Sequence, residues 1–361
     1  MKFRGVPILA ALILAALLSS CVSRPESDSA AAEGRLLFTD GRPADVWTMD
    51  ASGAHRTRLT NTHVSESAPQ WSPDGTHIAY EAKRRGQQAL CVMDASGGGR
   101  RCPVPKRYVG PASWSPDGSR LVYVGGGVVG PSWEIYTVEA SGGGITRLTH
   151  NRLGDFDPQW SPDGRSIAFS RNQTRSGHSD DIYVMAADGG SQRRLTESAR
   201  FEEDAHPRWS PDGSRLAFTR GEEGASVVYV VDLDGDETKL ATGHAFQEPV
   251  AAWSPDGALI AYAGDGIFVV DARGGKEAVR VTAPALGDKS PKGNSGRDVP
   301  LLAAAPMWSP DGAALLFHRT SLLQGFGFST PVHVHLMRAD GTGARELTTL
   351  RGPHAAVTNW R

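Results

Sequence analysis

Acidic residues recur at one position of this sequence, and their spacing is the first indication of chemistry. Glu66, Asp155, Asp204 and Glu248 each stand five residues before a tryptophan that opens a repeated motif. Carboxylates gathered around a concave opening focus a negative field and offer oxygen ligands to a divalent cation. These four residues are therefore candidates for a ring that binds a cation or a basic peptide segment. The alternative is that they cap turns through hydrogen bonds to the backbone and are simply solvated.

Arginines share a second repeat position, eleven residues after the tryptophan. Arg171, Arg220 and Arg319 stand there. They are candidates either to pair with the acidic residues or to bind an anionic ligand, and isolated surface arginines are the more frequent case.

The elements that must position these residues come from an internal repeat. The motif W-S-P-D-G occurs six times, beginning at Trp71, Trp114, Trp160, Trp209, Trp253 and Trp308. After each motif come a strand pattern such as Ile167-Ala168-Phe169, a second such as Ile182 to Met185, a Gly-rich turn and an R-L-T segment. Short β-rich runs at regular spacing, separated by turn residues, predict the four-stranded blades of a β-propeller.

The two ends of the repeat array indicate the number of blades. The array begins with a second-strand pattern, Leu36-Leu37-Phe38, and ends with a lone first strand, Val357 to Trp360. If the last strand completes the first unit, the chain has seven blades and no sheet edge at the seam. We expect an all-β, seven-bladed propeller over residues 35–361, with six blades and a stray unit as the alternative.

The first residues indicate export. Lys2 and Arg4 precede an apolar run from Val6 to Leu18, which is too short to cross a bilayer and is typical of a signal peptide. The following L-S-S-C resembles the bacterial lipobox, which implies a signal peptide at 1–20 and lipidation of Cys21. A plain secretory signal is the alternative. Residues 21–34 are predicted to be a flexible tether, and the resemblance implies the periplasmic side of an outer membrane.

The repeat as a whole resembles the TolB-type, WD40-like propeller repeat, on the strength of W-S-P-D-G, I-A-F and R-R-L-T. This resemblance implies an envelope protein that binds a protein or peptide partner. The formal net charge of −2 argues against a nucleic-acid partner. The sequence has no G-x-S-x-G, P-loop or H-E-x-x-H motif.

We therefore expect a lipid-anchored binding scaffold that is not an enzyme and has no resident cofactor. Two alternatives remain open. One is a propeller enzyme, since similar repeats occur in oligogalacturonate lyases. The other is a sensor of a metal or small ligand. Either would use the acidic positions, with a divalent cation there.

Cys91 and Cys102 are the two cysteines outside the leader. An exported protein meets an oxidising compartment, in which disulfides persist. If Ser96-Gly97 forms a two-residue hairpin turn, the two cysteines face each other across one blade and can form a disulfide. A longer turn would shift the register and leave two free thiols.

A long connection in the last blade is unusually apolar. Leu322, Leu323, Phe326 and Phe328 form a cluster there, interleaved with glycines. Exposed apolar groups of this kind often mark a partner site. The cluster is thus a candidate partner-binding surface, and its burial as a plug is the alternative.

Overall fold

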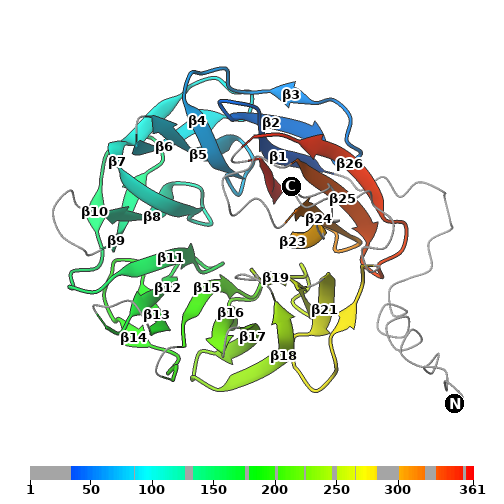
Figure 1. The fold of residues 1–361 in the computed structure, drawn as a ribbon. Helices are drawn as coiled ribbons and strands as arrows, with labels where there is room; N and C mark the ends of the chain where they lie inside the picture. Colours follow the sequence, from blue (N-terminus) through cyan, green and yellow to red (C-terminus); the bar gives the residue numbers. More distant parts are fainter. Residues whose placement is uncertain are drawn as a thin grey trace, which may run out of the picture.

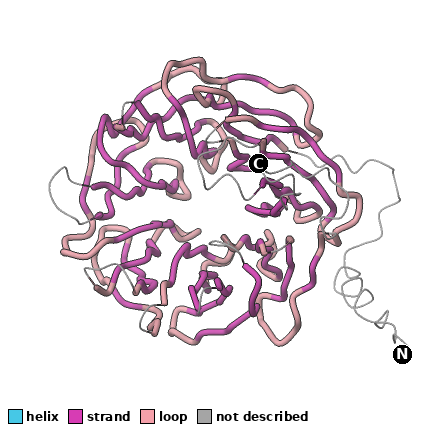
Figure 2. Tube along the Cα trace, viewed as in Figure 1, coloured by secondary structure: helices cyan, strands magenta, loops and turns pink. Residues whose placement is uncertain are grey.

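The described residues form a ring of β-sheets, and every regular element among them is a strand (Figures 1 and 2). The computed structural model describes residues 34–84, 86–126, 133–174, 179–199, 202–222, 225–245, 250–264, 266–282, 301–321, 331–352 and 355–361. In this part of the chain no helix has the length and apolar character needed to cross a membrane.

Seven four-stranded blades make up the ring, as predicted, and each is antiparallel throughout. Blade 1 contains β27 (Ala356–Trp360), β1 (Arg35–Asp40), β2 (Asp45–Asp50) and β3 (Thr57–Arg58). Blade 2 contains β4 (Ser65–Trp71), β5 (His77–Arg84), β6 (Gln87–Asp94) and the first half of β7 (Arg101–Trp114). Blade 3 contains the second half of β7, β8 (Arg120–Gly126), β9 (Trp133–Glu139) and β10 (Thr146–Arg147).

The remaining blades follow the same order from the innermost strand outward (Figure 1). Blade 4 contains β11 (Asp155–Trp160), β12 (Ser166–Asn172), β13 (Asp180–Ala186) and β14 (Arg193–Arg194). Blade 5 contains β15 (Asp204–Trp209), β16 (Arg215–Glu222), β17 (Ala225–Asp232) and β18 (Glu237–Ala245). Blade 6 contains β19 (Ala252–Trp253), β20 (Leu259–Ala263), β21 (Ile267–Asp271) and β22 (Val279–Arg280). Blade 7 contains β23 (Leu301–Trp308), β24 (Ala314–Ser321), β25 (Val332–Arg338) and β26 (Arg345–Leu350).

The hydrophobic core lies between blades rather than at the centre. Seven clusters of buried side chains each join one blade to the next. In β1, Leu37 packs toward blade 2, while Leu36 and Phe38 pack toward blade 7. Since both faces of such a strand are buried, its sequence is a continuous apolar run rather than an alternating one.

Four of the repeated tryptophans form a hydrogen bond to the preceding blade. The indole N–H of Trp209 donates to the carbonyl of Gln159 in blade 4, at 3.1 Å, and that of Trp253 donates to the carbonyl of Arg208 in blade 5, at 3.0 Å. Trp114 and Trp308 make the same bond to the blade before them. In these four blades the tryptophan combines the packing of a large ring with one directed hydrogen bond, whereas the indole N–H groups of Trp71 and Trp160 are buried without a partner among the described residues.

The seam between the chain ends is closed as the sequence predicts. β27 pairs with β1, which brings Val357 opposite Phe38 and Trp360 opposite Leu36. The backbone N–H of Val357 donates to Nε2 of the buried His318 in blade 7, at 3.0 Å. Blade 1 is therefore held by hydrogen bonds both to its own second strand and to the blade before it.

His318 makes the seam sensitive to acid. Burial lowers its pKa to about 4, because the charged ring would lose its hydration. The unfolded chain, with an ordinary histidine pKa, binds more protons than the folded chain between about pH 6.5 and 4. The free energy of unfolding therefore falls as the pH drops through this window, by about 3 kcal/mol in total.

We expect His318→Gln, which keeps an acceptor for Val357 but does not titrate, to lose less stability than the parent between pH 7 and pH 4.5. Urea unfolding at both pH values measures the difference. His63→Gln, at an exposed position, is the matched control and should leave the pH dependence unchanged. An identical acid response in parent and His318→Gln would contradict this role.

Candidate functional site

Three of the four predicted acidic positions are described, and none of them opens to solvent. Glu66 is 1% exposed, and Asp155 and Asp204 are 0% exposed. These three residues therefore do not form the expected acidic ring around an opening. The structure places each of them at the start of an innermost strand, where the preceding blade covers its side chain. Glu248 lies outside the described residues.

Asp155 and Asp204 are held by the arginines of the second repeat position. Nε and Nη2 of Arg171 bind the two oxygens of Asp155 at 2.6 and 3.0 Å, and Arg220 binds Asp204 in the same fork at 2.6 and 2.8 Å. Strand pairing brings each acid directly opposite its arginine. Of the two expectations for these arginines, pairing with the acids is the one observed in blades 4 and 5.

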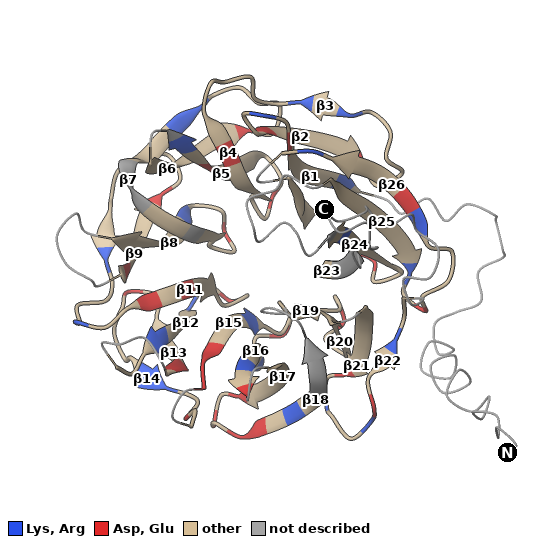
Figure 3. Cartoon of the chain, viewed as in Figure 1, with Lys and Arg blue, Asp and Glu red and all other residues tan. Residues whose placement is uncertain are grey.

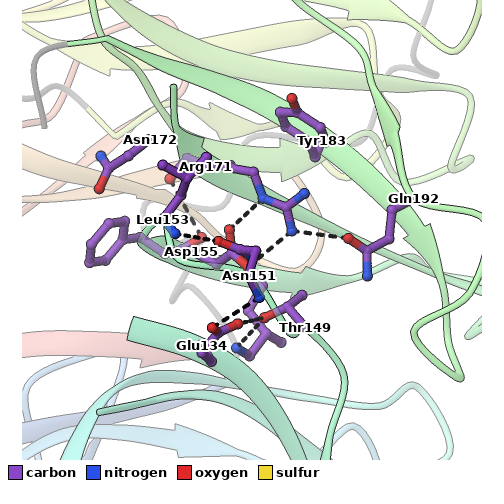
Figure 4. A network of polar contacts seen from close by, with 12 residues as sticks. Glu134, Thr149, Asn151, Leu153, Asp155, Arg171, Asn172, Tyr183 and Gln192 are labelled. Carbon is purple, nitrogen blue, oxygen red and sulfur yellow. Dashed lines mark hydrogen bonds and ion pairs between the residues drawn. The ribbon is translucent and has the colours of Figure 1, made fainter. Parts of the chain in front are cut away.

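Figure 4 shows how the pair in blade 4 extends into blade 3. The amide of Asn151 donates to Asp155 at 2.8 Å, while its backbone N–H donates to Glu134 of β9 at 3.2 Å. Thr149 donates to the same glutamate at 2.6 Å. A continuous polar network therefore crosses the boundary between the two blades.

Sequence reasoning missed the second set of acids in these networks, at the start of the third strand of a blade. Asp45, Glu134 and Asp181 are buried there, and each pairs with the arginine of its own R-L-T-type segment. The threonine of the segment accepts from a backbone N–H of the third strand, as Thr196 does from Ile182. The recurrence of an acid before the aliphatic run was the available signal. The structure thus explains the R-L-T segment. The arginine neutralises the buried acid, the leucine packs in the core between blades, and the threonine accepts a hydrogen bond from the third strand.

Glu66 differs from the other two acids because its strand partner is Ala82 rather than an arginine. It accepts hydrogen bonds from the hydroxyls of Thr60 and Thr62 and from the backbone of Val46. Burial raises its pKa, and these hydrogen bonds only partly oppose that effect. Within the described ranges, no three His, Cys, Asp or Glu side chains are grouped so that they could hold a metal ion.

Cys91 and Cys102 are joined by a disulfide in the structure. The hairpin between them is not the two-residue turn considered above. Its loop is Ala95 to Gly97, closed by Asp94 N–H to Gly98 carbonyl and Gly97 N–H to Asp94 carbonyl. Val92 nevertheless pairs with Arg101, which is the expected register that places Cys91 opposite Cys102, and the register shifts only before Leu90 pairs with Val104. Gly97 has a φ of +88°, which favours glycine.

The disulfide occupies a place where the other blades put an aromatic ring. Six blades stack two rings across their second and third strands, as Phe169 and Tyr183 do at 5.7 Å between centroids. In blade 2 the partner of Tyr80 is Cys91.

Two further predictions fall outside the described residues. Lipidation concerns Cys21 in residues 1–33, and the apolar cluster concerns Leu322, Leu323, Phe326 and Phe328 in residues 322–330. Both stay predictions.

A ring of carboxylates does exist at the S-P-D-G turns, which follow the other end of each innermost strand from Glu66, Asp155 and Asp204. Each S-P-D-G turn connects an innermost strand to the next strand of its blade, so the turns surround the propeller axis. The glycine of one turn lies beside the proline of the preceding blade's turn, as Gly213 does beside Pro162. The six aspartates are exposed: Asp74, Asp117, Asp163, Asp212, Asp256 and Asp311. We call this set the turn ring.

Every carboxylate of the turn ring is fixed in the same way. One oxygen, Oδ1, accepts from the serine hydroxyl of its own turn at 2.5–2.6 Å and from the backbone N–H two residues later at 3.0–3.1 Å. The serine bond and the backbone bond lower the pKa of these aspartates, to about 2 at Asp212. At Asp311 burial opposes this effect, but the two bonds outweigh it. The ring is therefore ionised at any physiological pH.

Basic residues also stand on this face, and charge is spread around the whole ring of blades (Figure 3). Arg120, Arg165 and Arg215 follow three of the turns. Arg215 is directed toward blade 6, where it binds the carbonyl of Ala272 and lies over Trp253. Sequence reasoning treated the S-P-D-G aspartates only as turn formers, although their sixfold repetition was visible.

The comparison with known families addresses the repeat directly. The family model described as the TolB beta propeller domain matches residues 104–262. Over this stretch the chain carries TolB-like β-propeller repeats. Two curated relatives align with stretches of this chain that are shorter than the stretch matched by the family model. An uncharacterized protein of Agrobacterium fabrum is 36% identical over 132 residues, or 36% of this chain and 42% of that protein. A TolB homolog of Chlorobium chlorochromatii is 31% identical over 126 residues, or 35% of this chain and 28% of that protein. The TolB-like chain thus matches less than half the length of each.

Solved structures share the fold of the TolB-like chain. TolB from Acinetobacter baumannii superposes with a TM-score of 0.55 at 23% identity, covering 76% of this chain and 70% of that one. An oligogalacturonate lyase in complex with manganese gives a TM-score of 0.60 at 21% identity, covering 79% and 82%. At these identities the likeness concerns the fold alone, because one propeller fold serves many functions.

Proposed function

We propose that this TolB-like chain is a binding scaffold that recognises a protein partner of the cell envelope through the turn ring. The observation that carries the proposal is the set of six exposed carboxylates held at equivalent positions around the axis. Because two hydrogen bonds already fix each carboxylate, the aspartate side chains would lose little conformational entropy when a partner binds them.

The chemistry of the ring selects the partner. Ionised carboxylates only accept hydrogen bonds, so a matching surface carries donors, above all lysine and arginine side chains. The adjacent Arg120 and Arg165 are long side chains on the exposed rim that could themselves meet an acidic residue of the partner. We infer that the partner presents a basic segment flanked by acidic residues. The buried Glu66, Asp155 and Asp204 give no support to a lyase-like or sensor role that would use them as ligands.

Neutralising half of the ring should weaken partner capture without unfolding the propeller. In the triple variant Asp163→Asn, Asp256→Asn, Asp311→Asn, the amide oxygen can still accept both turn bonds while the charge is lost. We expect at least a tenfold loss of the crosslinked partner band from the native envelope, with a melting temperature close to that of the parent.

The matched control removes the same charge from the outer turns of the same face, in Asp188→Asn, Asp234→Asn, Asp340→Asn. All three aspartates are exposed, and the carboxylates of Asp188 and Asp340 also accept a backbone N–H. Equal capture by the parent and the ring variant would reject the turn ring as the binding surface.

The proposal also places the protein on a membrane surface outside the cytoplasm, anchored by lipid on Cys21. The lipobox-like L-S-S-C after an apolar leader supports this location. We expect Cys21→Ser to move the protein from the membrane pellet into the soluble fraction, as followed by immunoblotting of fractionated cells. Membrane association of the substituted protein that persists through a high-salt wash would contradict lipid anchoring.

A further inference from the structure

Five innermost strands are interrupted by a bulge shortly before their tryptophan, and in four of them the residue three positions before the tryptophan is left-handed. The residues at the bulge adopt a left-handed conformation with φ between 49° and 56°: Ala68, Asp157, His206 and Ala305. This conformation is uncommon for residues other than glycine. Bulges re-aim a side chain and are frequent beside functional sites. Blades 2 and 7 place alanine there, whereas the adjacent blades 4 and 5 place an acid and a base.

The acid and the base meet across the boundary between their blades. Nε2 of His206 lies 3.7 Å from Oδ2 of Asp157, and Nδ1 of His206 lies 3.5 Å from the hydroxyl of Thr219. The side chains of Asp157 and His206 are 22% and 19% exposed. Both are therefore oriented by neighbours and still reachable by a solute.

Arg208 follows His206 by two residues on the same strand and is only partly exposed. Its Nη1 donates to the carbonyl of Pro207 at 3.0 Å. Among the described residues no carboxylate lies within ion-pair distance of it, unlike Arg171 and Arg220. Burial lowers the pKa of Arg208, and the charge of Asp157 opposes that effect.

A guanidinium carries five N–H donors, and in Arg208 the bond to the Pro207 carbonyl replaces only part of the hydration that burial removes. An oxyanion arriving at Arg208 would restore that interaction through a two-point fork. The negative charge of Asp157 beside the site favours an anion with a single charge over a phosphate dianion. These requirements describe a carboxylate.

We propose that Arg208, with His206 beside it, binds the carboxylate of a ligand at the innermost strands of blades 4 and 5. The ligand is either a peptide with a free C-terminus or a small organic acid, and in both cases the carboxylate is the group recognised. This site uses other residues than the turn ring. A negative result at Arg208 therefore does not contradict partner binding by the turn ring, and a negative result for the turn ring does not contradict carboxylate binding at Arg208.

Isothermal titration calorimetry with three probes tests the site on the full propeller. The probes are acetyl-trialanine with a free carboxylate, the same peptide as its C-terminal amide, and gluconate. We expect the free-acid peptide or gluconate to bind the parent, and the amide to bind at least tenfold more weakly than the free acid. Binding by the peptide assigns the site to chain termini, and binding by gluconate alone assigns it to small acids.

Substitutions then locate the binding. Arg208→Gln should lose at least tenfold in affinity, Arg208→Lys should lose less, and Asp157→Asn should gain several-fold because the repelling charge is gone. Arg193→Gln, at an exposed arginine of the outer strand β14 in blade 4, is the matched control. The melting temperature of Arg208→Gln should not fall, which separates binding from folding. Undetectable binding of both acids to the parent, or equal affinity in Arg208→Gln, would overturn the proposal.

Discussion

Deleting Val357 to Arg361 should destabilise the whole propeller, not only its last blade. The deletion removes most of β27 and with it the pairing to β1, the packing of the 2% exposed Val357 and the acceptor role of His318. It also removes the bond from Thr358 to the carbonyl of Pro69 in blade 2. Burial of one such aliphatic side chain contributes about 1.5–3 kcal/mol, and the lost hydrogen bonds about 1 kcal/mol each. We expect a loss on the order of 5 kcal/mol in the free energy of unfolding, measured by urea denaturation.

A rearranged chain provides the control for this deletion. In the blades that carry the motif, six residues separate the tryptophan from its partner on the next strand, as between Trp71 and Ile78. A variant in which residues 356–360 precede residue 35 through the linker S-P-D-G-S recreates that spacing, since Trp360 pairs with Leu36. This variant should regain most of the lost stability. A truncated protein with the parent's unfolding midpoint would show that β27 contributes nothing to closure.

Arg220→Met should be the most damaging single substitution in the polar networks. Arg220 is 8% exposed and binds both Asp204 and Glu237. Burial disfavours its charge, but these bonds outweigh burial and hold its pKa above the usual value. Removing the guanidinium leaves Asp204 buried with an unneutralised charge. We expect a loss of about 3–5 kcal/mol in the free energy of unfolding, which chemical denaturation measures.

The repeat supplies a control for this substitution as well. Arg319 stands at the same position of blade 7, but its strand partner is Ala303 instead of an acid. Arg319→Met should therefore cost less than Arg220→Met, because it leaves no buried acid on the opposite strand without its counter-charge. Adding Asp204→Asn to Arg220→Met should recover part of the loss, because the buried charge is then gone. Similar losses for Arg220→Met and Arg319→Met would mean that packing of the arginine stem, rather than the ion pair, stabilises blade 5.

The blade count and the closure could be predicted because both depend on short-range patterns. Trp360 continues the register of the six earlier tryptophans, and Leu36 to Phe38 lack a first strand before them. These signals need no knowledge of which side chains touch. The loop at Ala95 to Gly97 was harder, since the position of a left-handed glycine decides between two turns of similar composition.

The burial of the acidic positions could not be predicted from spacing alone. Whether Asp155 faces solvent depends on Asn151 and on Glu134 of the preceding blade, which lie close to it only after the blades pack. The pairing of Asp155 with Arg171 was more accessible, because the same separation recurs between Asp204 and Arg220. The left-handed bulge at Asp157 and His206 had no local signal, since blades 2 and 7 make the same bulge with alanine.

The closure of blade 1 also determines the order of events when the chain first folds. A nascent or exported chain emerges with its N-terminus first, so β1 to β3 are available long before β27. Until residues 356–360 appear, the inner edge of β1 has no strand to pair with, and such an edge can recruit a strand from another molecule. Completion of the ring must therefore wait until residues 356–360 have been synthesised or translocated, and a chain interrupted before them would carry an aggregation-prone edge in blade 1.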